Sequence, residues 1–153
     1  MSHAPLSMSV EPLQIRTATA SDAPQVTRLL DGLGYPTAAA DVPARLERLA
    51  TSRGAVFLAW RGTSAVGLAT VHVLSVLNRP ADVAWLTALV VDEQARGGGV
   101  GRALVAHVEA YARAAGCEKL SVTTHEERDG ARAFYVRVGL EPTGRRFGKM
   151  LGA

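Results

Sequence analysis

Apolar and polar positions in the first half of the chain follow two periods, one typical of strands and one typical of helices. Leu13–Thr17 alternates apolar with polar residues, which predicts a strand. Apolar residues three and four positions apart then predict a helix that Ser21 caps and Gly34 ends. A second helix follows, and then two strands joined by a short glycine-bearing turn, which predict a hairpin. The expected elements of this half are a strand at 13–17, helices at 21–33 and 41–49, and strands at 55–61 and 65–76.

The second half of the chain alternates strands and helices. An apolar run predicts a strand at 83–91, and a glycine-rich segment separates it from a helix that Gly116 ends. The remaining expected elements are a helix at 99–115, a strand at 120–124, a helix at 129–138 and an edge strand at 145–151. The order β-α-α-β-β-β-α-β-α-β is that of an α/β domain around a mixed sheet. We expect a single domain at residues 12–153, preceded by a disordered tail at residues 1–11.

Composition is that of an ordinary water-soluble globular protein. The 153 residues are 48% hydrophobic and 20% charged. No apolar run reaches the roughly 18–20 residues of a membrane span, and the N-terminus lacks the features of a signal peptide. Cys117 is the single cysteine, which excludes an intramolecular disulfide and cysteine-rich zinc sites. We therefore expect a cytoplasmic protein that holds no metal and contacts no membrane.

Positive charge is spread along the chain. The formal net charge is +3, and fifteen of the basic residues are arginines. These arginines alternate with acidic residues instead of gathering in one stripe, so nucleic-acid binding is not expected. A mildly basic protein suits a polyanionic small molecule better.

The segment Gln94–Leu104 carries the strongest chemical signal. Its four glycines free backbone N–H groups to converge on a ligand, and the start of the following helix adds a positive dipole end. These features predict a phosphate site. A P-loop is excluded because no lysine lies in the segment. The dinucleotide fingerprint is excluded because Arg102 or Leu104 stands where its third glycine is needed.

The spacing Arg96-Gly97-Gly98-Gly99-Val100-Gly101 resembles the pyrophosphate-binding signature of the GNAT family of N-acetyltransferases. Leu89-Val90-Val91-Asp92-Glu93 resembles the strand and turn before that signature, and Ala131–Leu140 resembles the family's A-x-x-F-Y-x-x-x-G-F segment. The resemblance covers residues 13–151 as architecture and 86–141 as motif. It implies an α/β (α+β) fold with a mixed, mostly antiparallel central sheet and about four flanking helices.

That family uses acetyl-coenzyme A, so the resemblance also implies a coenzyme site. The strand before the loop would pair with the pantetheine arm, and the loop would bind the pyrophosphate through backbone N–H groups and arginine side chains. Many members carry Lys or Arg where this chain has Gly98, so one positive charge is missing from the loop itself. The implied coenzyme contacts are Leu89, Val90, Val91, Arg96, Gly97, Gly98, Gly99, Val100, Gly101, Arg102, Arg128 and Tyr135.

Catalytic roles follow from the same resemblance. Tyr135 occupies the position of the family's general acid, and a phenol with a pKa near ~10 is matched to an alkyl thiolate. The N–H of Leu89, with Val90 as the alternative, would polarise the thioester carbonyl. The strand before the loop has no glutamate, so the general base stays open. The candidates for it are His125, His72, Asp82, Glu93 and a water molecule.

We therefore expect an acetyl-coenzyme A-dependent N-acetyltransferase that acts on a primary amine by direct attack in a ternary complex. A small-molecule acceptor is favoured, because the chain is a minimal domain without a docking extension. The alternatives are a non-catalytic acyl-coenzyme A sensor, a nucleotide-phosphate binder and a protein N-acetyltransferase. The sequence leaves the oligomeric state open between a monomer and a homodimer.

Overall fold

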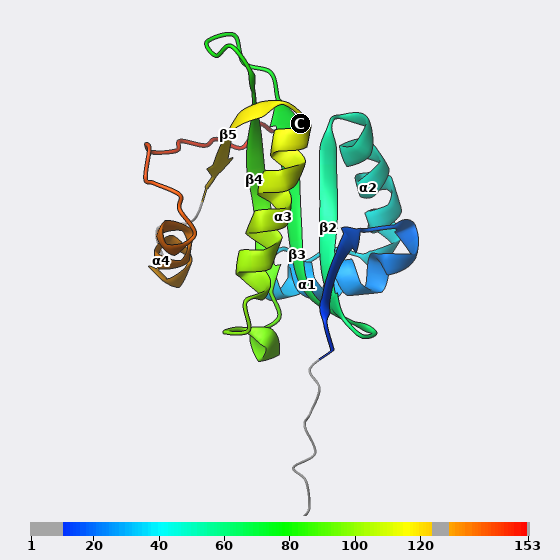
Figure 1. The fold of residues 1–153 in the computed structure, drawn as a ribbon. Coiled ribbons are helices and arrows are strands. Elements are labelled where there is room, and N and C mark those ends of the chain that lie inside the picture. The colour runs from blue at the N-terminus through cyan, green and yellow to red at the C-terminus, as the bar shows by residue number, and fades with distance from the viewer. Residues whose placement is uncertain (1–10, 124–128, 153) are drawn as a thin grey trace, which may run out of the picture.

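A computed structural model of the chain describes residues 11–123 and 129–152 (Figure 1). Its strands form one sheet in the order β1-β2-β3-β4-β5. The strands are β1 (Leu13–Thr17), β2 (Gly54–Arg61), β3 (Ser64–Leu74), β4 (Asp82–Val91) and β5 (Cys117–Val122). Strands β1 to β4 are antiparallel, and β5 runs parallel to β4. The mixed, mostly antiparallel sheet predicted from the sequence is confirmed.

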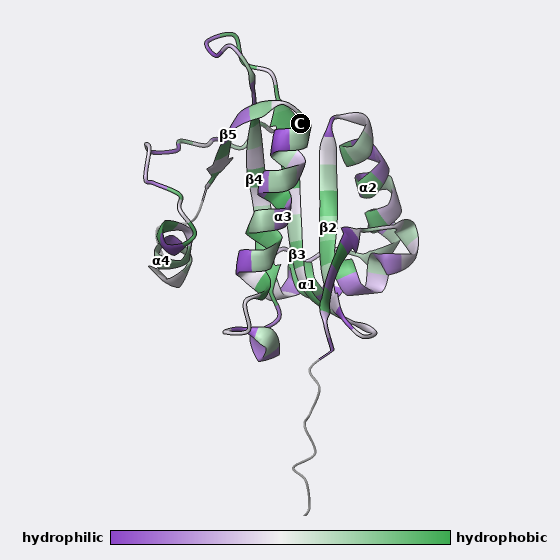
Figure 2. Cartoon of the chain, viewed as in Figure 1, coloured by the Kyte–Doolittle hydropathy of each residue, from purple (hydrophilic) through white to green (hydrophobic). Residues whose placement is uncertain are grey.

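Helices cover both faces of this sheet, because the strands carry apolar residues on both. The helices are α1 (Ala23–Leu33), α2 (Val42–Thr51), α3 (Val100–Ala114) and α4 (Asp129–Arg137). On β2, Val56 and Leu58 pack with α1 on one face, whereas Phe57 and Ala59 pack with α3 on the other. Figure 2 shows that the central strands are largely hydrophobic while the helices alternate hydrophobic with hydrophilic positions. The alternation places α1 and α3 on opposite sides of the sheet.

The first helix begins differently from the prediction. A 3-10 turn over Ala20–Asp22 precedes α1, and Ser21 is not its cap. The backbone N–H and the hydroxyl of Thr19 instead donate to the buried carboxylate of Asp22, at 2.8 and 3.1 Å. A carboxylate at this point satisfies donors that the start of a helix leaves free.

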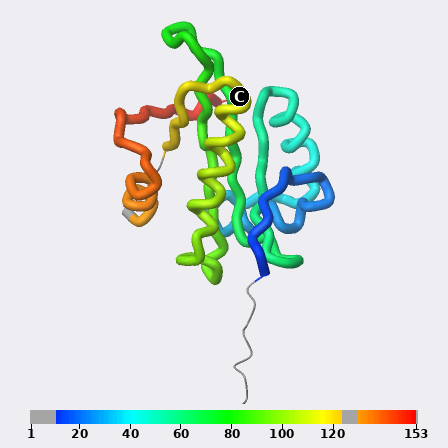
Figure 3. Tube along the Cα trace, viewed as in Figure 1, coloured from blue at the N-terminus to red at the C-terminus, as the bar shows by residue number. Residues whose placement is uncertain are grey.

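The C-terminal segment corrects a second prediction. Residues 145–151 form no strand, and the side chains of Phe147, Met150 and Leu151 are 93%, 94% and 86% exposed. Figure 3 shows the segment running outside the sheet after α4. An alternating pattern makes a strand only where a neighbouring strand offers free backbone groups, and no strand pairs with these residues in the structure.

Two further expectations concern the N-terminal tail and the absence of a membrane span. The tail predicted at residues 1–11 lies, apart from Glu11, outside the described residues. Within the described ranges, no helix is both long enough and apolar enough to cross a membrane.

Candidate active site

Strand β4 changes character at Thr87. Up to Leu86 it pairs with β3 on one side and β5 on the other, and its pairing with β5 ends there. On the β3 side, Thr70 pairs with Ala88 and Val71 pairs with Leu86, so Thr87 is an extra residue in the ladder. Such a β-bulge bends a strand and is frequent beside active sites. The loop end of β4 therefore leaves the parallel pairing that its first half makes.

The bulge also changes which positions of β4 face α3: even-numbered residues before it and odd-numbered residues after it. Before it, Ala84 and Leu86 pack on the α3 side; after it, Leu89 and Val91 do so. Val90 packs with α1 instead. Without the extra residue, strict alternation would place all even-numbered positions on one face.

Beyond the bulge, backbone groups of β4 point alternately toward and away from β3. The Asp92 N–H donates to the Val66 carbonyl at 2.8 Å, so Asp92 points toward β3. Alternation then directs Val90 toward β3, and Leu89 and Val91 away from it. Among the described residues, β5 pairs with neither of them. Their N–H and C=O groups form an open edge that an extended ligand can use.

The glycine-rich loop turns from this edge into α3. Gly97 and Gly99 have φ values of 83° and 81°, a left-handed conformation that residues with a Cβ rarely adopt. The first helical hydrogen bond runs from the Ala103 N–H to the Gly99 carbonyl at 3.0 Å, and among the described residues no side chain caps this helix start. The N–H groups of the first turn therefore have no partner within the helix and are of the kind that can bind an anion.

Close packing joins this helix start to α4. A Cβ added to Gly101 would lie 3.1 Å from a ring carbon of Phe134 and 3.6 Å from Val91. The rings of Phe134 and Tyr135 are 5.3 Å apart and edge to face. The loop, the open edge of β4 and the Phe-Tyr pair of α4 are thus neighbours, as the sequence motifs imply.

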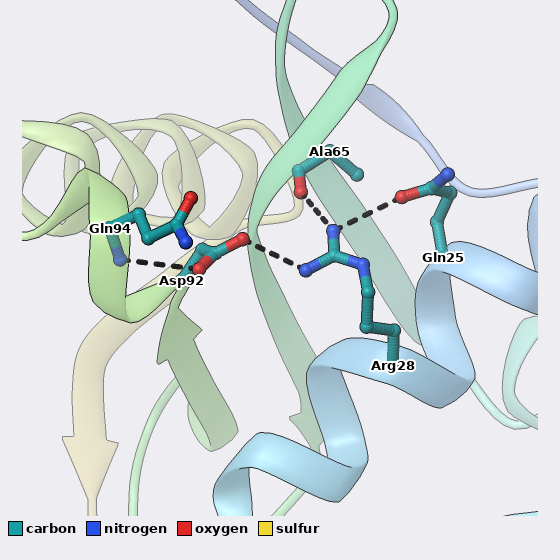
Figure 4. Close-up of polar contacts among 5 residues, drawn as sticks. All are labelled: Gln25, Arg28, Ala65, Asp92 and Gln94. Carbon is teal, nitrogen blue, oxygen red and sulfur yellow. Dashed lines mark hydrogen bonds and ion pairs between the residues drawn. The ribbon is translucent and has the colours of Figure 1, made fainter.

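On the α1 side, an ion pair holds the turn that follows β4. Arg28 of α1 donates to the Asp92 carboxylate at 2.8 Å and to the Ala65 carbonyl, and Asp92 also accepts the Gln94 N–H (Figure 4). A pocket of about 190 Å³ lies alongside, lined by Arg28, Leu29, Gly32, Val90, Val91, Asp92, Glu93 and Arg96. Arg28 therefore fixes the turn that follows β4 against α1.

Comparison with known proteins decides the family. A sequence model described as the acetyltransferase (GNAT) family matches residues 24–140. The chain belongs to the GNAT family of acetyltransferases.

Two relatives of this GNAT acetyltransferase are named for the amine-bearing compounds that they acetylate. It is 37% identical over 135 residues to an aminoglycoside N(6')-acetyltransferase of Stenotrophomonas maltophilia, covering 86% of this chain and 88% of that one. It is 34% identical over 94 residues to an aminoalkylphosphonate N-acetyltransferase of Salmonella typhimurium, covering 61% of each. An aminoglycoside N-acetyltransferase solved with coenzyme A superposes with a TM-score of 0.84 at 20% identity, covering 97% of this chain and all of that one. The protein is an N-acetyltransferase, and the solved structure confirms its fold.

Two candidates for the general base of this GNAT enzyme lie away from the loop end of β4. Asp82 stands at the opposite end of β4, about 20 Å along the strand from Leu89. A hydrogen bond from Arg53 and another from Ser75, each 2.7 Å, lower the pKa of Asp82. His72 of β3 pairs with Trp85, and its Nε2 lies 3.4 Å from the Ser52 hydroxyl. Neither side chain adjoins the open edge.

Of the other residues predicted for the GNAT site, three lie in the described part of the chain and two lie outside it. Glu93 is exposed and lines the pocket beside Arg28. Arg96 and Arg102 are exposed on the loop and the first turn of α3. Arg128 and His125 lie outside the described residues. His107 is half-buried and packs edge to face on Phe57, with the ring centroids 4.5 Å apart.

Sequence reasoning missed three features that build this GNAT site. Thr87, the single polar residue among Val83–Val91, was the only sign of the bulge. Gly67 was the sign of a second feature, the close packing of α3 on β3, because a glycine inside a strand often marks a close approach. A Cβ there would lie 2.8 Å from Leu104 and 2.9 Å from Val100 of α3. Nothing in the sequence pattern indicated that Arg28 would bond to Asp92, since 64 positions separate the two residues.

Proposed function

We propose that this protein binds acetyl-coenzyme A between the open edge of β4 and the start of α3, and transfers the acetyl group to a small-molecule amine. The observation that carries the proposal is the combination of two free backbone surfaces. Leu89 and Val91 direct hydrogen-bonding groups away from β3, and the start of α3 has no side-chain cap. An extended amide-bearing arm fits the first surface, and a pyrophosphate fits the second.

The glycines support this fit. At Gly101 a side chain would approach the Phe134 ring to 3.1 Å, and at Gly98 one would approach the Ala95 carbonyl to 3.3 Å. Gly97 and Gly99 leave open space in front of the loop instead. A backbone without side chains lets phosphate oxygens approach the N–H groups closely.

The catalytic roles rest on this placement. Acetyl-coenzyme A supplies the acetyl group as a thioester. The acceptor nitrogen attacks the carbonyl carbon, so that a C–N bond forms while the C–S bond breaks. The N–H of Leu89 donates to the carbonyl oxygen as negative charge develops on it. The hydroxyl of Tyr135 protonates the departing thiolate, and the attacking amine loses its proton to a base. Asp82 and His72 lie away from the edge, whereas Glu93 lies at the loop end of β4. We propose a water molecule as that base, oriented by groups beside the open edge, with Glu93 as the alternative.

The acceptor class is proposed from the relatives. An aminoglycoside is the first candidate, because the similarity to the Stenotrophomonas enzyme extends over most of both chains. An aminoalkylphosphonate is the second, supported by the shorter match to the Salmonella enzyme. The two acceptors differ in charge, since the first is polycationic and the second carries an anionic phosphonate. We also propose the reducing cytoplasm as the compartment, where the free Cys117 would remain a thiol.

Two measurements test the proposal. Calorimetry with acetyl-coenzyme A, coenzyme A, ATP and NAD should give saturable binding of the first two alone. Thiol release should then appear when aminoglycosides or aminoalkylphosphonates are added. Tight binding without acetyl transfer to any amine of a broad panel would instead favour a sensor, and binding of ATP or NAD but not coenzyme A would favour a nucleotide binder.

A further inference from the structure

The hairpin between β2 and β3 brings one arginine to the glycine-rich loop. Arg61 is the last residue of β2, and its Nη2 donates to the Gly98 carbonyl at 3.1 Å. The two residues are 37 positions apart in the sequence, and they come from the hairpin and from the turn before α3. The contact therefore joins the loop to a strand at the other side of β3.

Gly98 and Arg61 fit each other sterically. A Cβ added to Gly98 would lie 3.4 Å from Nη1 and 3.5 Å from Nη2 of Arg61, and 3.3 Å from the Ala95 carbonyl. The guanidinium is therefore in van der Waals contact with the position that a Cβ at residue 98 would occupy, and the tighter approach would be to the Ala95 carbonyl.

The bond orients the peptide group between Gly98 and Gly99. No peptide bond within residues 11–123 or 129–152 is cis, and in a trans peptide the C=O and the following N–H point in opposite directions. With the Gly98 carbonyl held toward Arg61, the Gly99 N–H is turned away from it. Arg61 thus acts on the ligand side of the loop through this peptide.

The charge of Arg61 is not neutralised. Arg28 and Arg53 each form an ion pair, with Asp92 at 2.8 Å and Asp82 at 2.7 Å. No carboxylate of residues 11–123 or 129–152 pairs with Arg61, and its buried Nε has no partner among these residues. A positive charge at this place raises the electrostatic potential of the loop for an anion.

We propose that Arg61 is a positioning residue for the coenzyme: it fixes the Gly98–Gly99 peptide so that the Gly99 N–H faces the pyrophosphate, and it supplies positive charge that Gly98 cannot. The inference rests on the proposed coenzyme site. It assigns to β2 a part in holding the loop.

Steady-state kinetics and calorimetry on the full chain test this role. Arg61→Ala should raise the KM and the Kd for acetyl-coenzyme A about ten-fold, as expected for one charge-assisted hydrogen bond, while kcat and the KM for the amine stay unchanged. Arg61→Lys should recover part of the affinity, because it keeps the charge and one donor. Arg79→Ala, which removes an arginine paired with Glu118, is the matched control and should leave coenzyme affinity unchanged.

Gly98→Ala gives an independent test from the loop side, because its methyl group would lie 3.3 Å from the Ala95 carbonyl and in contact with the guanidinium, and so would disturb the same peptide. The double variant should lose no more affinity than the more impaired single variant, since both disturb one contact. Additive losses, or an Arg61→Ala protein with wild-type affinity, would overturn the inference. If the wild-type protein itself bound no coenzyme, the proposed function would fail instead. Equal melting temperatures of the variants verify that the proteins compared are folded. If Arg61→Ala does not fold, the coenzyme affinities of Arg61→Lys and Gly98→Ala test the inference instead.

Discussion

The two ends of strand β4 are built in opposite ways. At its first end, the segment 83–86 pairs with strands on both sides, and Arg53 and Ser75 hold the Asp82 carboxylate. At its last end, beyond Thr87, the strand pairs with β3 alone among the described residues and continues into a loop of glycines. The first end satisfies its polar groups within the protein, and the last end leaves backbone groups unpaired among the described residues, where we propose that the coenzyme binds.

This difference lets one strand combine stability with the binding that we propose. A fully paired end resists local opening, because its backbone hydrogen bonds and side-chain contacts must break together. An end with free N–H and C=O groups can add a hydrogen-bonded partner without breaking any existing bond. We therefore expect changes at the open end to affect turnover and coenzyme affinity, and changes at the paired end to affect stability.

The largest effect is expected from Tyr135→Phe. If the phenol protonates the thiolate, kcat should fall by about 10²- to 10⁴-fold, the usual contribution of a general acid, while the Kd for acetyl-coenzyme A stays close to that of the wild type. Tyr111→Phe removes the hydroxyl of a tyrosine packed edge to face on Phe57 and serves as the control. Full activity of the Tyr135 variant with a good acceptor would show that another group donates the proton.

Next in size is the effect of removing a backbone N–H. Leu89→Pro deletes a donor that faces the open edge, where proline is tolerated, so kcat should fall by about 10²- to 10³-fold with the fold retained. Val90→Pro deletes a donor that faces β3 and should abolish the cooperative thermal transition. Turnover and circular dichroism separate the two outcomes. Retained activity in Leu89→Pro would remove this N–H from the mechanism.

A smaller loss, now of stability, is expected from Gly67→Ala. The new methyl group would meet Leu104 and Val100 of α3 at under 3 Å, so urea unfolding should show a loss of about 1–3 kcal/mol from overpacking. Gly32→Ala places a methyl group in open space on α1 and should be neutral or slightly stabilising. Equal stabilities of the two variants would mean that α3 can move away from β3 without cost.

The smallest effect concerns the paired end of β4. Hydrogen bonds from Arg53 and Ser75 lower the pKa of Asp82 in the folded protein. The stability that this carboxylate contributes is therefore complete above its unfolded pKa and is lost as the pH falls through the folded value. Between about pH 5 and pH 3, the melting temperature of Asp82→Asn should fall less steeply than that of the wild type. Asp41→Asn, which removes an exposed carboxylate, should keep the wild-type slope.

The sequence predicted most of the secondary-structure elements, but not the contacts that join residues distant in the sequence. The hydrophobic period located β1 to β5 and all four helices within a few residues, because burial on the sheet faces repeats at fixed intervals. The loop was recognised because glycine spacing is a local property. Arg61 and Arg28 could not be assigned, since their partners lie 37 and 64 positions away and depend on the tertiary fold. The strand expected at 145–151 was wrong for the same reason, because strand pairing is non-local.

The bulge at Thr87 has a consequence for protein engineering. The bulge reverses which positions of β4 face α1 and which face α3. The chain from Thr87 to the start of α3 therefore packs correctly only when this extra residue is present. A graft that carried residues 88–101 into another sheet without the bulge would leave Leu89 and Val91 facing the wrong neighbours. The smallest transplantable module therefore begins at the bulge, and single-residue insertions or deletions within β4 should be far less tolerated than substitutions.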